Sequence, residues 1–307
     1  MIDILMATFN EGQFIEDQLD SILCQTYSEW KLIIADDCST DNTVSILEKY
    51  QRKYPDKISF YVNEYPTGSA KKNFFLLLDK ASSDYVMLAD QDDIWLKDKI
   101  ELTYKMRLKA EKENDIDTPL LVHTDLCVVD QKLSVINKSI FAMQQMDYHR
   151  DQLNNLLVSN IVTGCTTMVN RALLNMLGRK PENTIMHDMW LALVAAAFGK
   201  IYFINKSTIL YRQHGNNSNG AKNETSADYL VEKITHLKEV HKSLGEHYRQ
   251  ADEFLEIFKE RLSTNQIIML DSYSKMDSYC LLKKIRVLKR FDLFKVGFIR
   301  VIGQIVC

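Results

Sequence analysis

Apolar runs and helix-like segments alternate with a regular rhythm over the first 125 residues of the chain. Four short runs are almost continuously apolar and are expected to form strands, at residues 2–8, 31–37, 58–64 and 84–90. Between them, apolar residues recur with helical spacing at residues 14–25, 39–54 and 70–81. This alternation is typical of βαβ units, and continuously apolar strands suit a parallel sheet that is covered on both faces. The sequence therefore predicts an α/β fold with a mainly parallel central sheet.

The pattern is less regular after residue 118. We expect a strand, then a strand, turn and helix, then an apolar helix and finally two short strands, at residues 119–130, 159–177, 187–200 and 201–212. The Asn- and Gly-rich stretch that follows is the clearest domain boundary, because these residue types favour loops. We therefore expect an α/β domain over residues 1–222 and a mainly helical region over 223–307.

The composition fits a globular chain with a sizeable core, because 46% of the residues are hydrophobic and 26% are charged. No apolar run reaches the roughly 18 residues that a membrane-spanning helix needs, so none is expected. The first residues lack the pattern of a signal peptide, and none is expected there. The six cysteines include no C-x-x-C pair, which favours reduced thiols over a zinc site or a disulfide framework.

Three carboxylates, Asp90, Asp92 and Asp93, directly follow the apolar run at residues 85–89. Adjacent carboxylates repel one another unless a cation compensates their charge. Closely spaced oxygen ligands suit Mg²⁺ or Mn²⁺, and Mg²⁺ commonly binds substrate phosphates at the same time. The acidic tip, as we call residues 90–93, therefore predicts a site for a divalent metal and a phosphate.

Polar side chains also follow the first two predicted strands, at the sheet edge where open α/β proteins bind their ligands. They are Thr8, Asn10, Glu11, Asp36 and Asp37. Asp and Asn are common cap and turn residues, and that ordinary role is the alternative for each of them. Because these side chains are expected to meet at one sheet edge, a shared binding site is the favoured interpretation.

Several common classes of phosphate-binding protein lack their signature in this chain. There is no G-x-x-x-x-G-K-[ST] for a P-loop enzyme, and no G-x-G-x-x-G follows the first strand for a dinucleotide-binding dehydrogenase. A haloacid-type phosphatase needs its D-x-D at the first strand, which here ends in Thr8, Phe9 and Asn10. The acidic tip therefore indicates another kind of phosphate chemistry.

The stretch MATFNEGQFIEDQLDSILCQTYSEWKLIIADDCSTDNT, followed by DYVMLADQDDIW, resembles the family 2 glycosyltransferases. The resemblance extends from residue 2 to about residue 220. It implies a GT-A nucleotide-sugar-binding fold, with a nucleotide-binding half at residues 1–95 and an acceptor half at 96–222. The motifs LADQDDIW, HDMW and YRQHGNN are most similar to bacterial rhamnosyltransferase-like enzymes of cell-wall, capsule or O-antigen synthesis.

The resemblance assigns the nucleotide to the ends of the first two strands. Thr8 and Phe9 would line the base pocket, with Glu11 nearby. Asp37 would accept a hydrogen bond from the ring N–H of the pyrimidine. Its neighbour Asp36 is the alternative for this role.

The resemblance also implies contacts to the phosphates and the metal. The family often has a basic residue near the nucleotide, in the helix after the third strand. Lys72 matches it best, and Lys71 is the alternative. Asp90 would face the ribose or the waters of the metal, and Asp92 would ligate Mn²⁺ or Mg²⁺. Asp93 stands at a variable position and could support either neighbour.

Two later motifs complete the implied site. In MHDMW, Asp188 matches the catalytic base of the family, while His187 replaces the usual Glu and could tune Asp188 or contact the acceptor. Trp190 could stack on a sugar or lie in the core. In YRQHGNN, His214 could be a metal ligand or contact the diphosphate, and Arg212 could neutralise phosphate.

The implied reaction is an inverting, metal-dependent glycosyl transfer in one displacement, with Asp188 as general base. dTDP-rhamnose is the implied donor, with UDP-sugars as the alternative, and the acceptor would be a saccharide or a polyprenyl-linked saccharide. A non-catalytic sugar-nucleotide-binding assembly subunit and a nucleotidyltransferase are two further classes. The presence of both Asp92 and Asp188 disfavours the first, and the pattern of Thr8, Asp37 and HDMW disfavours the second.

The segment at residues 283–307 holds seven basic residues and one acidic residue, so it carries +6 while the rest of the chain carries −9. Apolar residues recur in it at roughly helical spacing, at Ile285, Leu288, Phe291, Phe294 and Phe298. Such a basic amphipathic helix can lie on an anionic membrane surface, with packing on the domain or on a second copy of the chain as the alternative. We therefore expect a cytoplasmic protein at the inner face of the plasma membrane, and leave a homodimer open. Nucleic acid is not an expected partner, because the basic cluster stands alone in an acidic chain.

Overall fold

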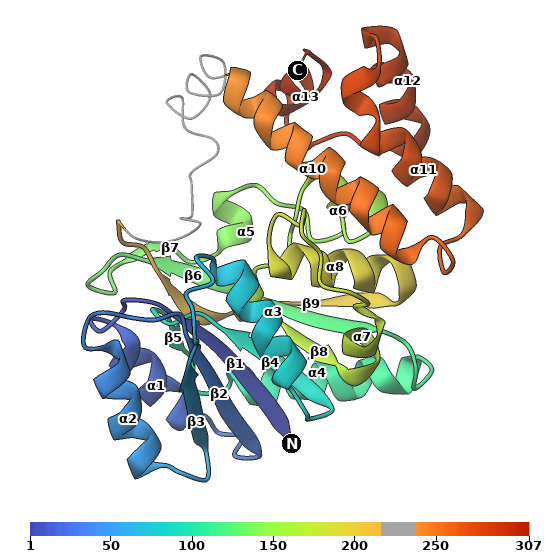
Figure 1. The fold of residues 1–307 in the computed structure, drawn as a ribbon. Coiled ribbons are helices and arrows are strands. Elements are labelled where there is room, and N and C mark those ends of the chain that lie inside the picture. The colour runs from blue at the N-terminus through green and yellow to red at the C-terminus, as the bar shows by residue number, and fades with distance from the viewer. Residues whose placement is uncertain (216–236, 307) are drawn as a thin grey trace.

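One β-sheet runs through the computed structural model, which describes residues 1–215 and 237–306 (Figure 1). Its strands within those residues are β1 (Ile2–Thr8), β2 (Trp30–Asp36), β3 (Ile58–Val62), β4 (Tyr85–Ala89), β5 (Ile94–Trp95), β6 (Leu120–Val129), β7 (Val135–Asn137), β8 (Met168–Asn170) and β9 (Lys200–Arg212). They are arranged in the order β3-β2-β1-β4-β8-β6-β9-β5, and β7 pairs with β6.

The strands β1 to β4 are parallel to one another, as the sequence predicts. Helices α1 (Ile15–Leu23), α2 (Thr43–Lys53) and α3 (Ala70–Lys80) connect them as βαβ units. The consecutive residues Ile4 and Leu5 of β1 are both fully buried. Since neighbouring side chains on a strand point to opposite faces, both faces of the sheet are covered here. The parallel register places Thr8 of β1 beside Asp36 of β2 at the carboxyl edge of the sheet. The end of β4 lies next to β1, on its other side.

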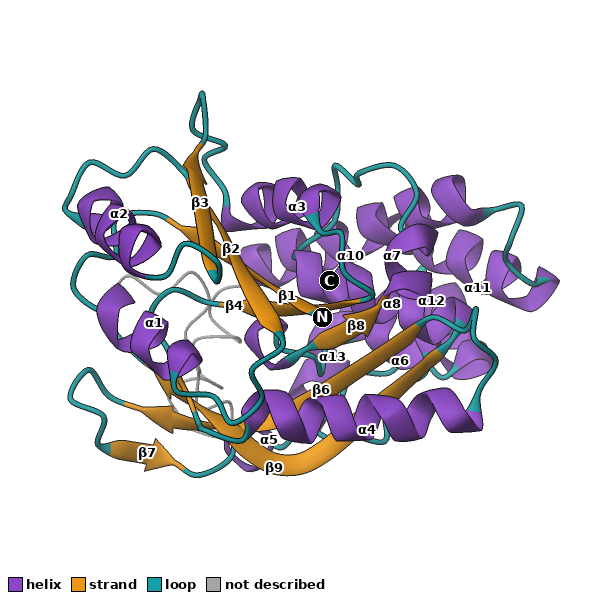
Figure 2. Ribbon diagram, turned by 90° about the horizontal axis from the view of Figure 1, so that it is seen from below, coloured by secondary structure: helices purple, strands orange, loops and turns teal. Residues whose placement is uncertain are grey.

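The other half of the sheet is mixed, so the mainly parallel arrangement holds only for the N-terminal half. β8 lies antiparallel between β4 and β6, whereas β6 and β9 are parallel to each other. β9 is one long strand where two short ones are predicted, because the polar pair Asn205 and Lys206 is accommodated where the register with β6 shifts. Helix α4 (Lys99–Glu113) lies across β6 and β9 (Figure 2).

The helix α8 (His187–Phe198) is apolar nearly all round, and such a helix needs partners on every side. One partner comes from the C-terminal region, where α10 (Leu237–Phe258) packs over it (Figure 1). The ring of Trp190 lies 5.2 Å from that of Phe254 and 5.9 Å from that of Phe258, between centroids. The C-terminal region is therefore packed into the core of the α/β domain. The predicted boundary at 222/223 lies outside the described residues.

The remaining helices of the described residues are short or belong to the C-terminal region. They are α5 (Ile140–Met143), α6 (Leu153–Val158), α7 (Arg171–Met176), α11 (Thr264–Ser274), α12 (Leu281–Phe291) and α13 (Phe298–Val306), with 3₁₀ turns at Gly164–Thr166 and Met276–Ser278. The α/β fold class with a C-terminal helical segment is confirmed. None of the described helices combines the length and the apolar character that crossing a membrane requires.

The basic segment after residue 283 forms two helices, because the chain turns at Asp292, which has a φ of 50°. The apolar side of α12 packs on the protein, where Val287 and Leu288 are buried. Lys284 is also buried, whereas the other basic residues of α12 remain exposed, next to the exposed side chains of Leu281 and Leu282. The apolar stripe of α12 is therefore used for packing within the C-terminal region, where α12 contacts α11 and α13.

Candidate active site

A cavity of about 670 Å³ opens at the carboxyl edge of β1 and β2. Its walls come from the end of β1, the loop after β3, the start of α3 and the acidic tip. The lining residues include Thr8, Phe9, Glu11, Asp37, Gly68, Lys71, Gln91 and Met186. We call it the donor-side cavity, because residues that the resemblance assigns to the nucleotide line it. The structure thus brings four of the residues predicted for the nucleotide, Thr8, Phe9, Glu11 and Asp37, to one cavity.

Asp37 is held by a dense set of hydrogen bonds at the wall of this cavity. Its Oδ1 accepts from Asn63 Nδ2 at 2.9 Å and from the Thr67 amide at 2.7 Å. Its Oδ2 accepts from Thr67 Oγ1 at 2.9 Å and from the Gly68 amide at 3.0 Å. Burial alone would raise its pKa, but these donors outweigh burial and lower the pKa below its ordinary value. A base N–H that binds Asp37 must therefore displace one of these donors or share its oxygen.

Asp36 has a structural role instead. It is fully buried and accepts from Thr8 Oγ1 at 2.8 Å, and from the amide and hydroxyl of Ser39 at 2.7 Å and 2.6 Å. It does not line the donor-side cavity, whereas Asp37 does. Of the two neighbouring carboxylates, only Asp37 is placed to meet a ligand there.

Gln91, which the sequence analysis did not single out, fastens the acidic tip to the end of β1. Its Oε1 accepts from the Phe9 amide at 2.7 Å, and its Nε2 donates to the Phe9 carbonyl at 3.3 Å and to Glu11 Oε2 at 3.1 Å. The ring of Phe9 remains 52% exposed. The position of Gln91 between two carboxylates at a strand end was the sequence feature from which a contact of this kind could have been predicted.

The lysine prediction must be corrected from Lys72 to Lys71. The side chain of Lys72 is exposed and does not line the cavity. Lys71 lines it, and its ammonium donates to the Thr184 carbonyl. Burial, and next the charge of Lys72, lower the pKa of Lys71. Adjacent side chains on a helix point about 100° apart, so only one of the two lysines of α3 can face the cavity, and it is Lys71.

A second cavity of about 130 Å³ adjoins the first. We call it the acceptor-side cavity, because Asp188, the base that the resemblance implies, lines it. Both are lined by Ala7, Glu11, Ala70, Gln91 and Met186, so they share a wall. The second cavity is also lined by Phe74, Asp90, Asp92, Thr163, Gly164, His187, Asp188 and Tyr211. The acidic tip and the predicted catalytic base, which are about a hundred residues apart in the chain, thus meet in one place.

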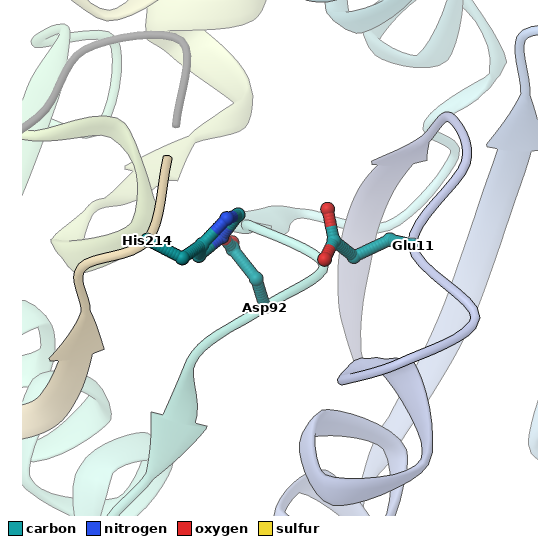
Figure 3. Close-up of side chains that lie close together, drawn as sticks. All are labelled: Glu11, Asp92 and His214. Carbon is teal, nitrogen blue, oxygen red and sulfur yellow. The ribbon is translucent and has the colours of Figure 1, made fainter. Parts of the chain in front are cut away.

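Glu11, Asp92 and His214 form a compact group at the edge of this space (Figure 3). Their candidate ligand atoms all lie within 4.8 Å of one another, and His214 Nε2 is 2.7 Å from Asp92 Oδ2. Burial, and next the charge of Asp92, raise the pKa of Glu11 to about 7. Carboxylate oxygens suit Mg²⁺ and Mn²⁺, and an imidazole is a common ligand of divalent transition metals. The group fits a divalent cation, and Glu11, which was expected only near the base pocket, is a member of it.

Asp90 and Asp93 lie on the inner side of the acidic tip. With Cys165 they form a second group within the described residues whose candidate ligand atoms lie within 4.8 Å of one another. Burial, and next the charge of Asp92, raise the pKa of Asp90 to about 7 and that of Asp93 well above its ordinary value. Asp93 is fully buried, and its Oδ1 accepts from the Arg212 amide at 3.2 Å. This hydrogen bond joins the acidic tip to the end of β9.

Asp188 lies in the first turn of α8 and is partly exposed to the acceptor-side cavity. Its Oδ2 accepts from the Gly164 amide at 3.0 Å and its Oδ1 from the Met189 amide at 2.6 Å. Burial raises the pKa of Asp188 to about 6, against these hydrogen bonds, which lower it. A carboxylate with a pKa in that range can accept a proton from a substrate near neutral pH.

His187 is a buried imidazole that borders the same cavity. Its ring stacks on Phe74 at 4.0 Å between centroids, and it is only 3% exposed. Neither ring nitrogen has a hydrogen-bond partner among the described residues. Burial lowers the pKa of His187 to about 3, so the ring is neutral at physiological pH. A Cβ on Gly164 would lie 2.9 Å from His187 Nε2, so this glycine leaves the space that the ring occupies.

Trp190 is fully buried between α8 and α10, with its ring against Phe254 and Phe258. A fully buried indole has no face free to stack on a sugar. The prediction of a sugar-stacking role for Trp190 is therefore wrong, and its alternative, a place in the core, is what the structure has. The reason is a contact with α10, more than 60 residues further along the chain.

Arg212 is likewise committed to the protein. Its Nε donates to the Asp92 carbonyl at 2.9 Å, its Nη1 to the Gln131 carbonyl at 2.9 Å and its Nη2 to Asp17 Oδ2 at 2.8 Å. The residue is 3% exposed. The prediction that it neutralises a phosphate is therefore corrected: its guanidinium joins the acidic tip to α1 and to the loop after β6.

A comparison with known families agrees with this geometry. The model of the family described as glycosyl transferase family 2 matches residues 3–177. The chain belongs to glycosyltransferase family 2. The dTDP-rhamnosyl transferase RfbG of Shigella flexneri is 31% identical over 252 residues, covering 77% of this chain and 82% of the relative.

This family 2 chain is also similar to a second curated protein and to a solved structure. The UDP-Glc:alpha-D-GlcNAc-diphosphoundecaprenol beta-1,3-glucosyltransferase WfgD of Escherichia coli is 30% identical, over 63% of this chain and 70% of that protein. Among solved structures, the mannosyltransferase PcManGT from Pyrobaculum calidifontis in complex with GDP-Man and Mn²⁺ superimposes with a TM-score of 0.54. That match has 16% identity and covers 99% of this chain and 83% of the other, and it shows a shared fold. The predictions of a glycosyltransferase with a GT-A fold, similar to rhamnosyltransferases, are confirmed.

Proposed function

We propose that this glycosyltransferase moves a sugar from a nucleotide sugar to a saccharide acceptor, with inversion and with the help of a divalent metal. The observation that carries the proposal is the pair of adjoining cavities. One contains Asp37, the other contains Asp188, and Glu11 and Gln91 of the acidic tip lie in the wall that they share. A nucleotide in the first cavity would thus present its sugar beside a carboxylate that can accept a proton.

The donor that we propose is dTDP-rhamnose, with UDP-sugars as the alternative. The support is the identity of 31% with RfbG, whose name describes a dTDP-rhamnosyl transferase. The name of WfgD describes a UDP-glucose donor instead, which keeps the alternative open. In either case we assign the pyrimidine to Asp37. We assign the ribose side to Asp90, which lines the acceptor-side cavity where the two cavities adjoin. Thr8 and Phe9 form the neighbouring wall, and we assign a phosphate contact to Lys71, which lines the same cavity.

The metal that we propose is Mn²⁺ or Mg²⁺, held by Asp92, His214 and Glu11. When bound, such an ion stabilises the negative charge of a departing diphosphate as a Lewis acid. The fit rests on the three neighbouring ligand atoms, since two carboxylates this close favour a cation between them. Asp93 and Arg212 hold the tip in this arrangement through the backbone contacts described above.

The chemistry that we assign to the chain itself centres on Asp188. Its carboxylate takes the proton from the acceptor hydroxyl as that oxygen bonds to the anomeric carbon. At the same time the bond from the anomeric carbon to the diphosphate breaks, and the diphosphate leaves with the electron pair. One displacement of this kind inverts the anomeric configuration and needs no nucleophile from the protein. The transition state resembles an oxocarbenium ion, as in glycoside hydrolysis.

His187 is proposed to bind a hydroxyl of the acceptor or of the transferred sugar. A buried polar group without a partner is costly, and a ligand hydroxyl in the acceptor-side cavity would supply the missing hydrogen bond. Since the ring is neutral, it can donate from one nitrogen and accept at the other.

The acceptor that we propose is a saccharide or a polyprenyl-linked saccharide of bacterial surface polysaccharide synthesis. The name of WfgD describes an acceptor linked to diphosphoundecaprenol, which supports the second form. A cytoplasmic protein that acts on such an acceptor would work at the inner face of the plasma membrane. The exposed basic side of α12, with Leu281 and Leu282 beside it, is the surface proposed to touch anionic lipid.

A panel of nucleotide sugars tests this proposal by thermal shift with Mn²⁺ present. We expect dTDP-rhamnose to raise the melting temperature most, and an Asp37→Ala variant to lose that rise. Stabilisation by a UDP-sugar instead would select the alternative donor. A chain that no dTDP-, UDP- or GDP-sugar stabilises, with or without Mn²⁺, would contradict the proposed function.

A further inference from the structure

The segment at residues 182–186, which we call the strap, leads directly into α8 and borders both cavities. Met186 lines the donor-side and the acceptor-side cavity. The carbonyl of Thr184 accepts a hydrogen bond from the ammonium of Lys71, which lines the donor-side cavity. The residue that follows the strap is His187, and the next is Asp188. The position of the strap therefore affects groups on both sides of the proposed reaction.

On its other side, the strap is held by α10 through Glu253. This carboxylate accepts from the Glu182 amide at 2.8 Å and from the Asn183 amide at 2.6 Å. Glu253 is only 5% exposed, and Arg179 Nη1 lies 3.5 Å from its Oε1. Hydrogen bonds from backbone amides to a charged carboxylate are stronger than neutral ones, the more so where water is excluded.

One turn earlier on α10, Gln250 holds the next part of the strap. Its Oε1 accepts from Thr184 Oγ1 at 3.0 Å and from the Ile185 amide at 2.9 Å. Gln250 is fully buried, and Thr184 is 1% exposed. Without Gln250, the part-buried Ile185 amide would lose its acceptor, and the Thr184 hydroxyl would keep only the Met186 carbonyl, at 3.1 Å. Both losses are unfavourable for the present path of the strap.

We propose that Gln250 and Glu253 are positioning residues, which act through the strap on Lys71 and Asp188. A polar chain runs from Gln250 through Thr184 to Lys71, and so from α10 to the donor-side cavity. The C-terminal helical region thereby helps to position residues of the proposed active site. This inference rests on the proposed function for its effect on turnover, whereas the hydrogen bonds themselves do not depend on it.

Two variants and a matched control test the inference in the full-length chain. Gln250→Leu removes both hydrogen bonds from Gln250 to the strap, and Glu253→Gln replaces one carboxylate oxygen with a donor that cannot accept from a backbone amide. Asp252→Asn is the control, because Asp252 is exposed on the same helix and the change of charge is the same as in Glu253→Gln. Hydrogen exchange of the strap, calorimetric binding of dTDP and UDP with Mn²⁺, and turnover are measured for each.

We expect the 185 amide to exchange faster in Gln250→Leu, and one of the amides at 182 and 183 to do so in Glu253→Gln, by roughly tenfold for the hydrogen bond that each loses. Nucleotide affinity and kcat should fall together, by about threefold to thirtyfold, while Asp252→Asn matches the wild type. Faster exchange with nucleotide affinity and kcat at wild-type values would overturn the inference, since the contacts would then be structural only. Unchanged exchange would also overturn it. A wild-type chain that binds no nucleotide would contradict the proposed function, and the inference with it.

Discussion

His214 Nε2 lies 2.7 Å from Asp92 Oδ2, and this contact joins the residues that follow β9 to the acidic tip after β4. The two residues are 122 positions apart in the chain. Glu11, from the residues after β1, completes the group (Figure 3). Three separate segments thus place a carboxylate, an imidazole and a second carboxylate within reach of one cation.

Removal of a member of this group should weaken metal binding. We expect Asp92→Asn and His214→Ala each to lower the affinity for Mn²⁺ by at least about tenfold, because the ion loses one of the side chains that bind it directly. Titration calorimetry with Mn²⁺ measures this directly. Asp56→Asn is a suitable control, since Asp56 is exposed and lies in the loop before β3. Equal Mn²⁺ affinity in all four proteins would contradict the assignment of the metal site.

The pH dependence of turnover should follow Asp188. Burial raises its pKa to about 6. A general base works only when deprotonated, so kcat should decrease as the pH falls through about 6 and reach a plateau above it. The profile is measured at saturating donor and Mn²⁺, so that protonation of Glu11 and Asp90 does not limit binding. A kcat that stays constant between about pH 5 and 7 would argue against Asp188 as the base.

The two adjacent lysines of α3 should differ in their effect on the donor. Lys71→Met removes a cation from the wall of the donor-side cavity, and we expect it to weaken nucleotide-sugar binding by roughly tenfold, the order of one charge-assisted hydrogen bond. Lys72→Met removes the same charge from the exposed side of the helix and should leave binding close to the wild type. Calorimetry with dTDP distinguishes them, and a larger loss for Lys72→Met would reverse our correction.

Trp190 should matter for stability and not for acceptor recognition. Trp190→Ala leaves a cavity between α8 and α10, and we expect it to lower the free energy of unfolding by about 3–5 kcal/mol. Trp190→Phe, which keeps an aromatic ring, should cost less and leave the KM for the acceptor unchanged. Urea titration and acceptor kinetics measure the two effects. A raised acceptor KM in Trp190→Phe at full stability would restore the sugar-stacking role.

The N-terminal half of the fold could be predicted because its signals are local. A continuous apolar run such as residues 85–89 identifies a buried strand, and the βαβ rhythm then places the carboxyl ends of β1, β2 and β4 along one edge. Asp37 and Asp92 could be placed near each other on that basis alone. The mixed half of the sheet could not be predicted in the same way, because β8 is only three residues long and pairs antiparallel on both sides.

The errors in the site come from contacts over long distances in the chain. Nothing near Trp190 in the sequence reveals that Phe254 and Phe258 cover it. Arg212 lies next to a polar loop, yet Asp17 and the acidic tip take up its guanidinium. The hydrogen bond from the Gly164 amide to Asp188 was missed for the same reason. The glycine in VTGC was a local sign that another side chain comes close to the backbone there.

The central claim is that Asp188 is the general base of a metal-dependent glycosyl transfer, and one measurement tests it most directly. Sugar transfer or donor hydrolysis is followed with dTDP-rhamnose and Mn²⁺ for the wild type and for Asp188→Asn, alongside the binding of the donor to each. We predict that Asp188→Asn binds the donor as tightly as the wild type and turns it over about 10²–10⁴-fold more slowly. Turnover at the wild-type rate in Asp188→Asn would contradict the account.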